Sequence, residues 1–349
     1  MSRGSALLAL AALIALPARG AADPPRAGGG TAPDQDFWGW LLEPHKPEVD
    51  LVLRKAAGNR NEALRRSPYD SYQGYDAAWA TRRRELLADA EGMLRYALEL
   101  QPDSPRLLRE LAIVTDERGR PSAREHLERY LAVESPDRST ADARMRLGRW
   151  YARERRFGEA IAQLRLALGG RPDARTALAA RQLLALVYMQ TGRLAEAIDL
   201  LRGGLVGGHP PGALPDYATP YLLAVAYDRD EQITLAHQTL EQIARLSPDA
   251  LSQVLIDQHG NRLEVLPGWE RHYLAALQFE VLGQLVEARA EWLAYLRWDE
   301  APYRARARQH LVAVERMLRD QATGRAARPA PPRPHAPVPP VAPAAGGTP

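Results

Sequence analysis

The side chains in this sequence that could carry acid–base or metal chemistry are its histidines and the acidic residues near them. His45 lies between Glu43 and Glu48, but neighbouring prolines leave no helix that would bring the three side chains together as metal ligands. His259 and His272 flank the end of an insertion and could meet in space, where paired imidazoles bind metals or transfer protons. We interpret both as surface histidines, one in a loop and one on a helix.

No catalytic motif accompanies these residues. The sequence contains no Gly-x-Ser-x-Gly, no glycine-rich phosphate-binding loop and no His-Glu-x-x-His. It also contains no cysteine, which excludes disulfides, thiolate metal sites and a cysteine nucleophile. We therefore predict that the protein is not an enzyme and has no catalytic residue, no metal site and no cofactor.

The distribution of charge bears on the kind of partner. The formal net charge of the chain is +3. Arg3 and Arg19 lie in a leader, and Arg325, Arg328 and Arg333 lie in a C-terminal tail, so the body between them has no excess of positive charge. A folded domain that binds nucleic acid should present a net basic face. We therefore expect a protein or peptide partner and no nucleic acid.

The elements that would position any binding residue are amphipathic helices. Over residues 143–172, apolar and small side chains fall on one stripe twice, at the three-and-four spacing of a helix, with a break near Arg155. Gly148 and Ala160 are small where two such helices would cross, and Pro172 ends the second helix. The pattern predicts a helical hairpin.

The same spacing returns along the chain. Small residues recur at the crossing position at Ala197, Ala236 and Ala288, and weaker copies lie upstream over 76–104 and 105–138. The pattern resembles the tetratricopeptide repeat (TPR), which is about 34 residues long, with short insertions in the first two gaps and a long one in the third. The family pattern is matched at Leu147, Gly148, Tyr151, Ala160, Leu164 and Pro172.

The resemblance implies an all-α fold, a TPR-like α-solenoid of helical hairpins over residues 76–320. The long gap, near 250–268, is expected to hold a small β-hairpin or loop insertion, with a short helix ending at Ile256 as the alternative. The first copy has only Gly92 as a helix breaker, so it could form one long helix. The repeats are expected near 76–104, 105–138, 141–174, 178–211, 217–250 and 269–302, followed by a closing helix over 303–320.

The ends of the chain differ in composition from the array. Residues 1–22 are predicted to be a signal peptide, because Arg3 gives a positive start and the apolar run over 6–16 is too short to span a bilayer. Cleavage is expected between Gly20 and Ala22, with a retained membrane anchor as the alternative. The other segments are a disordered linker over 23–35, a capping segment over 36–75 and a Pro/Ala-rich disordered tail over 321–349. We therefore expect a bacterial protein, periplasmic or secreted, with no stable membrane span after cleavage.

The resemblance also implies where a partner binds. In TPR-like arrays the first helix of each repeat lines the concave side, so its side chains that are not used for stacking form a groove for another protein or peptide. The predicted groove residues are Arg109, Met145, Arg149, Arg153, Gln182, Met189, Tyr221, Arg229, Tyr273 and Glu280. Leu186 and Val225 stand where the carboxylate clamp of chaperone-binding TPRs needs asparagine, so the clamp is not implied.

These observations favour an exported TPR scaffold that mediates protein–protein interaction in the assembly or function of a cell-envelope complex. One alternative is a structural envelope spacer or adaptor, whose contacts lie in the aromatic N-terminal segment, the 249–268 insertion or the proline-rich tail. A more remote alternative is an envelope hydrolase with an unrecognised site near His259 and His272.

Overall fold

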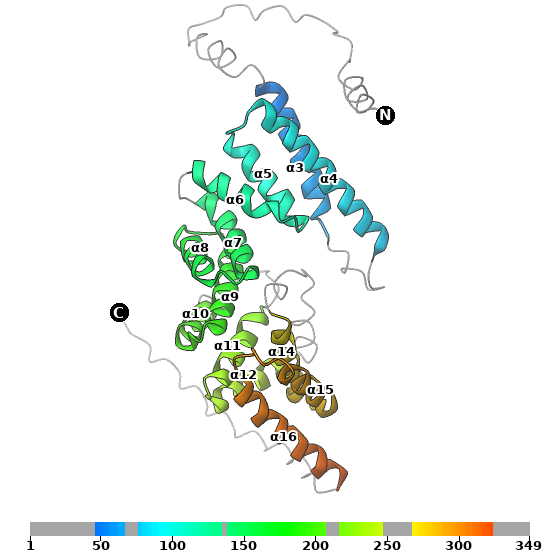
Figure 1. The fold of residues 1–349 in the computed structure, drawn as a ribbon, viewed down its shortest axis with the longest axis vertical. Coiled ribbons are helices and arrows are strands. Elements are labelled where there is room, and N and C mark those ends of the chain that lie inside the picture. The colour runs from blue at the N-terminus through cyan, green and yellow to red at the C-terminus, as the bar shows by residue number, and fades with distance from the viewer. Residues whose placement is uncertain (1–45, 67–75, 135–137, 207–215, 247–266, 324–349) are drawn as a thin grey trace, which may run out of the picture. The chain divides into compact units, whose positions relative to one another are not determined.

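The structure, a computed structural model, describes residues 46–66, 76–134, 138–206, 216–246 and 267–323. Within these ranges all regular secondary structure is α-helical, and successive helices pack as hairpins (Figure 1). The prediction of an all-α, TPR-like array is confirmed. The helices are α3 (Lys46–Ala63), α4 (Ala77–Leu100), α5 (Pro105–Glu117), α6 (Ser122–Val133), α7 (Arg138–Arg153), α8 (Phe157–Gly169), α9 (Ala174–Gln190), α10 (Leu194–Val206), α11 (Ala218–Arg229), α12 (Ile233–Leu246), α14 (Gly268–Val281), α15 (Leu285–Leu296) and α16 (Arg304–Ala322).

Several predicted features lie outside the described residues. They are the signal peptide over 1–22, the linker over 23–35, nearly all of the 250–268 insertion, and the tail from residue 324 onward. Residues 48–349 form one compact unit, distinct from residues 1–47, and this unit contains every described helix apart from the first residues of α3.

Local capping explains where several helices begin. Asp76 precedes α4 and accepts a hydrogen bond from the backbone N–H of Trp79 at 2.8 Å, and Asp173 accepts one from Thr176 at 2.9 Å before α9. A carboxylate there satisfies an N–H that the helix cannot pair, and it meets the positive end of the helix dipole. Pro105 opens α5, where its missing N–H leaves no hydrogen bond unmade.

One turn geometry closes the first helix of five hairpins. A residue with a left-handed backbone stands after each of these helices, at φ of 64°, 59°, 72°, 59° and 70° for Gly119, Arg155, Gly192, Glu231 and Gly283. The next residue donates its N–H to the carbonyl five residues earlier in all five cases, at 2.8–2.9 Å. This bond caps the carbonyls left unpaired at a helix C-terminus. The five turns therefore give a common register for comparing the repeats.

Small residues allow the two helices of a hairpin to approach each other closely. A Cβ atom on Gly148 of α7 would lie 2.7 Å from the side chain of Leu164 on α8, so only glycine fits at this crossing. Ala160 is completely buried at the same crossing, as are Ala197 and Ala288 in α10 and α15.

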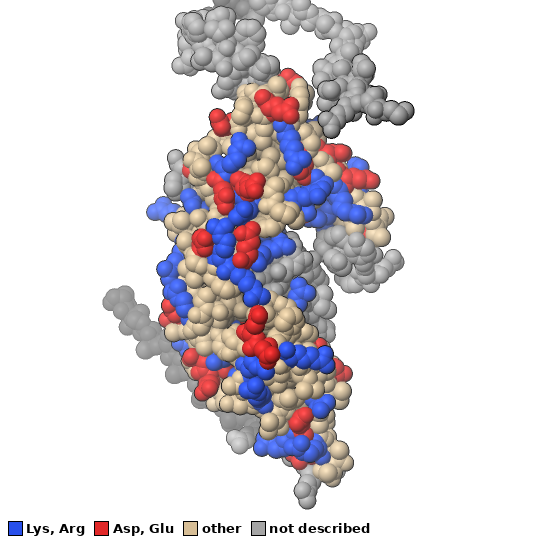
Figure 2. Space-filling model, viewed as in Figure 1, with Lys and Arg blue, Asp and Glu red and all other residues tan. Residues whose placement is uncertain are grey.

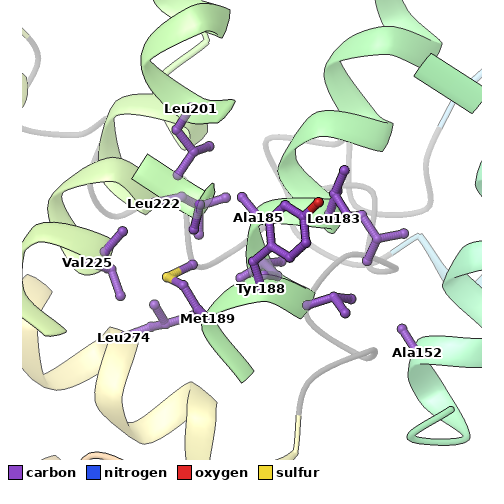
Figure 3. Packing of buried hydrophobic residues seen from close by; sticks show 14 of the residues in the cluster. Ala152, Leu183, Ala185, Tyr188, Met189, Leu201, Leu222, Val225 and Leu274 are labelled. Atoms are coloured by element: carbon purple, nitrogen blue, oxygen red, sulfur yellow. The ribbon is translucent and has the colours of Figure 1, made fainter. Parts of the chain in front are cut away.

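Two continuous apolar cores run through the array. One extends from α5 to α16, and Figure 3 shows part of it, where Met189 of α9 points toward Leu222 and Val225 of α11 and lies near Leu274 of α14. The other joins α3 to α4 and α5 through Val49, Leu53 and other buried side chains. α4 is a single helix of 24 residues, and hydrogen bonds from Tyr96 to Glu48 and from Trp79 to Arg66 join it antiparallel to α3.

Candidate binding surface

Most of the predicted groove residues are buried. The side chains of Met189, Tyr221 and Tyr273 have almost no exposed surface, and the Tyr221 hydroxyl donates to the Leu274 carbonyl at 2.5 Å. Consecutive first helices contact one another (α5 with α7, α7 with α9, α9 with α11), so residues between them become interior. The structure therefore corrects the groove prediction for the six buried residues, which are packing residues: Met145, Gln182, Met189, Tyr221, Arg229 and Tyr273.

The other four predicted groove residues do not share one surface. Arg153 is exposed and its guanidinium lies 4.7 Å from the centroid of the Trp150 ring. Arg149 and Glu280 are half-buried and belong to two separate charge clusters. Arg109 is exposed and lines a cleft at the α3 end of the array.

The first charge cluster, named here the Asp116 cluster, joins α5 to α7. Asp116 is buried three residues before the left-handed Gly119, and it accepts hydrogen bonds from Arg146 at 2.5 Å, Arg149 at 2.6 Å and Trp150 Nε1 at 2.8 Å. Burial alone would raise the pKa of this carboxyl, but the charges of Arg149 and Arg146 outweigh that effect and lower the pKa. The cluster is therefore a charged but neutralised link between successive first helices.

The second charge cluster, the Asp228 cluster, joins α11 to α14 and α16. Asp228 is buried three residues before the left-handed Glu231, and it accepts from Tyr273 Oη at 2.6 Å, Arg306 Nη2 at 2.6 Å and His310 Nε2 at 2.9 Å. Burial opposes its ionisation, but the hydrogen bond and charge of His310, with those from Arg306 and Tyr273, lower the pKa of Asp228 to about 2.

His310 is held between two acids in this cluster. Its Nδ1 lies 3.0 Å from Glu280 Oε2, and its ring stacks on Trp292 with centroids 4.7 Å apart. Burial would lower the pKa of His310, but its hydrogen bonds to Asp228 and Glu280 raise that pKa to about 9. The imidazolium therefore donates from both nitrogens and holds α16 to α11 and α14.

A buried ion pair lies beside this cluster. Arg229 Nη2 and Glu270 Oε2 are 2.5 Å apart, and both side chains are only 1% exposed. The Arg229 guanidinium also lies 4.5 Å from the ring centroids of Tyr273 and Tyr303. The sequence predicts that Arg229 faces a partner. In the structure its charge is instead paired with Glu270 inside the fold.

The cleft around Arg109 is the best candidate for a binding surface among the described residues. This α3–α5 cleft has a volume of about 390 Å³. Buried Leu53 and Tyr130 contribute apolar surface, and α3, α5 and α6 each supply lining residues. The cleft is lined by Leu53, Arg54, Ala57, Pro105, Arg106, Arg109, Glu110, Tyr130 and Glu134.

The charges at the cleft are only partly neutralised. Arg106 pairs with Asp50 at 3.1 Å, and Glu110 pairs with Arg60 at 2.6 Å. Arg54 and Arg109 make no ion pair with any residue that the structure describes. Two available guanidinium groups beside apolar surface can bind a carboxylate through paired N–H groups while apolar neighbours of that carboxylate are buried.

The histidines considered for catalysis do not form a site in the described part of the chain. His272 Nδ1 lies 2.6 Å from Glu291, while His45 and His259 lie outside the described residues. In the ranges that the structure covers, no three histidine or acidic side chains are grouped so that they could hold a metal ion. No helix in those ranges has the length and apolar character needed to cross a membrane.

Comparison with known proteins gives only distant likenesses. No family model matches the sequence, and no curated protein matches it. Among solved structures, Pseudomonas aeruginosa PilF is similar over 77% of this chain and 99% of its own, with 17% identity and a TM-score of 0.44. The TPR domain of P58(IPK) covers 67% of this chain and 94% of its own length, with 14% identity and a TM-score of 0.25.

A third structure, human IFIT1 solved with m7Gppp-AAAA, covers 82% of this chain and 73% of its own length, at 14% identity and a TM-score of 0.35. At these TM-scores none of the three identifies a family or a partner for this chain. The absence of a nucleic-acid partner stays a prediction.

Proposed function

We propose that this chain is an exported scaffold that binds a short acidic and apolar segment of another cell-envelope protein in the α3–α5 cleft. The observation that carries the proposal is the pair of available guanidinium groups, Arg54 and Arg109, beside the buried apolar surface of Leu53 and Tyr130. Export rests on the predicted signal peptide, and it is part of the proposal.

Charge distribution supports a local acidic ligand over a long polyanion. On the face shown in Figure 2, basic and acidic side chains are interspersed over the helices and form no extended basic stripe. Nucleic-acid binding relies on many phosphate contacts along such a stripe. Two arginines in a cleft suit one or two carboxylates, and the apolar lining suits the side chains between them.

The test uses a short labelled peptide in which leucine and glutamate alternate, titrated into the protein by fluorescence anisotropy. We expect Arg54→Glu with Arg109→Glu to weaken binding by at least about tenfold, because two favourable contacts become repulsive. The matched control is Arg120→Glu with Arg175→Glu, since both arginines are exposed and lie outside the cleft.

Three results would contradict the proposal. They are an unbound peptide, equal weakening by the two double variants, and undiminished binding when glutamine replaces every glutamate in the peptide. Arg149 is unsuitable for this test because it binds Asp116, so its reversal would disturb the fold as well as any surface.

A further inference from the structure

We propose that a second cleft binds the chain's own proline-rich segment, residues 328–343, in a polyproline II conformation. The cleft, named here the Trp269 cleft, has a volume of about 180 Å³. Its lining comes from the turn between α7 and α8, the end of α9, the start of α14 and the segment before α16. The lining residues are Arg155, Phe157, Gln190, Pro267, Trp269, Glu300 and Pro302.

Four of the seven residues that line this cleft are aromatic or proline: Phe157, Pro267, Trp269 and Pro302. The Trp269 ring packs against the Trp298 ring, with centroids 5.6 Å apart. The Arg155 guanidinium lies 4.8 Å from the centroid of the Trp269 ring. Phe157 and Pro302 add apolar surface. Aromatic-lined grooves are the surfaces on which proline-rich segments dock, because the flat rings match the preformed ridges of a polyproline II helix.

Trp269, one of the residues that line this cleft, has an unused hydrogen-bond donor. Its side chain is 5% exposed, and its buried indole Nε1 has no acceptor among the residues that the structure describes. A buried indole N–H normally finds a partner, and leaving it unpaired costs free energy. A polyproline II segment makes no internal hydrogen bonds, so its backbone carbonyls are available as acceptors. The missing acceptor is therefore of a kind that a docked proline-rich segment supplies.

The length of the chain makes its own segment the occupant. Pro302 lines the cleft just before α16, and α16 has 19 residues, so its far end lies roughly 28 Å away along the helix axis. A polyproline II chain rises about 3.1 Å per residue, so about nine residues after Ala322 span the return. The prolines from Pro331 to Pro343 then lie within reach of the cleft.

Charge and tethering both favour this occupant. The segment 328–343 carries Arg328 and Arg333 and no acidic residue. Glu300, on the cleft lining, is exposed and has no ion-pair partner among the residues that the structure describes. Because a tethered ligand has an effective concentration in the millimolar range, even an intrinsic Kd on the order of 100 μM gives mostly occupied clefts.

The test compares the chain ending at Thr323 with the full chain, using a labelled peptide of residues 328–343. We expect the truncated chain to bind the peptide and the full chain to bind it about tenfold more weakly, because its own segment competes. A control peptide with alanine in place of every proline should not bind.

Two variants of the truncated chain locate the contact. Trp269→Phe keeps an aromatic ring but removes the N–H donor, and it should weaken peptide binding about fivefold. Glu300→Gln, at an exposed position, should reduce the salt dependence of binding and leave the fold unchanged.

Four results of the peptide titrations would overturn the proposal. They are no binding to the truncated chain, equal binding to both chains, binding of the alanine peptide as tight as that of the proline peptide, and binding unaffected by both variants. Self-association of the full chain that disappears on truncation would assign the cleft to the segment of a second copy, and would equally overturn it.

Discussion

The Asp116 and Asp228 clusters stand at the same place in their repeats, yet they are built from different partners. Each acid lies three residues before the left-handed residue of its hairpin turn. Asp116 is bound by two arginines and a tryptophan, all from α7. Asp228 is bound by a tyrosine from α14 and by an arginine and a histidine from α16. The same position therefore links α5 to one following helix and α11 to two.

In the two repeats between these clusters, the residue three positions before the left-handed turn residue is uncharged. The equivalent residues are Ala152 and Met189, both buried in the apolar core. An apolar residue at this position packs against the next repeat. A buried acid at the same position instead requires hydrogen-bond donors from the helices that follow. The difference teaches that charge at this position selects particular neighbours, and that of the two clusters only the Asp228 cluster includes a histidine, whose pKa is raised to about 9.

The largest expected effect comes from removing each acid. Asp228→Ala leaves the buried Tyr273 hydroxyl unpaired and two cationic side chains with fewer partners, so it should lower the free energy of unfolding by about 3–5 kcal/mol. Asp116→Ala should lower the free energy of unfolding by less, about 1–3 kcal/mol, because Arg146 still pairs with Asp142 and Glu117. Urea denaturation measures both, and equal or reversed losses would contradict the comparison.

The next largest expected effect is a difference between the two clusters in how their contribution to stability depends on pH. The folded-state pKa of His310 is raised from 6.5 to about 9, so its stabilisation is fully present below pH 6.5 and is lost as pH rises through about 9. The full loss is on the order of 3 kcal/mol. Asp116 has a lowered pKa and arginine partners, so its contribution is lost only on acidification.

Thermal unfolding between pH 6 and 10 measures this alkaline loss. The variant His310→Gln cannot lose a proton there, so its stability should vary much less over the same range. An identical alkaline loss in the variant would assign the effect to other groups.

The smallest expected effect concerns the turns that follow the two acids. Gly119 and Glu231 both have a left-handed backbone, which glycine adopts readily and a glutamate does not. Glu231→Gly should therefore raise stability by about 0.5–1 kcal/mol, and Gly119→Ala should lower it by about 1 kcal/mol. Thermal unfolding of the two variants measures both changes. Midpoint shifts of the same sign in Glu231→Gly and Gly119→Ala would show that the two turns are not equivalent.

The hairpin architecture was predictable from the sequence because its determinants are local. Gly148 and Ala160 lie within one hairpin, and their size alone indicates a close crossing of two helices. Gly119, Gly192 and Gly283 likewise mark turns through their conformational freedom. The turns at Arg155 and Glu231 carry no such signal, because the residue with the left-handed backbone is not a glycine there.

The candidate binding surface was only partly predictable. Helical periodicity assigned Tyr221 and Tyr273 to the first helices, but it could not show that the next first helix covers them. Asp228 and His310 are 82 residues apart in the chain, so no local pattern indicates their contact. Arg109 is exposed, and its cleft depends on α3, which lies outside the repeat pattern.

Hydrogen exchange with and without the leucine–glutamate peptide tests the proposed binding surface most directly. The peptide should slow exchange of backbone amides in α3, α5 and α6, with little change in α9, α11 and α14. Protection of the first helices along the middle of the array, with none in α3 or α5, would contradict the account and restore a groove as the binding surface.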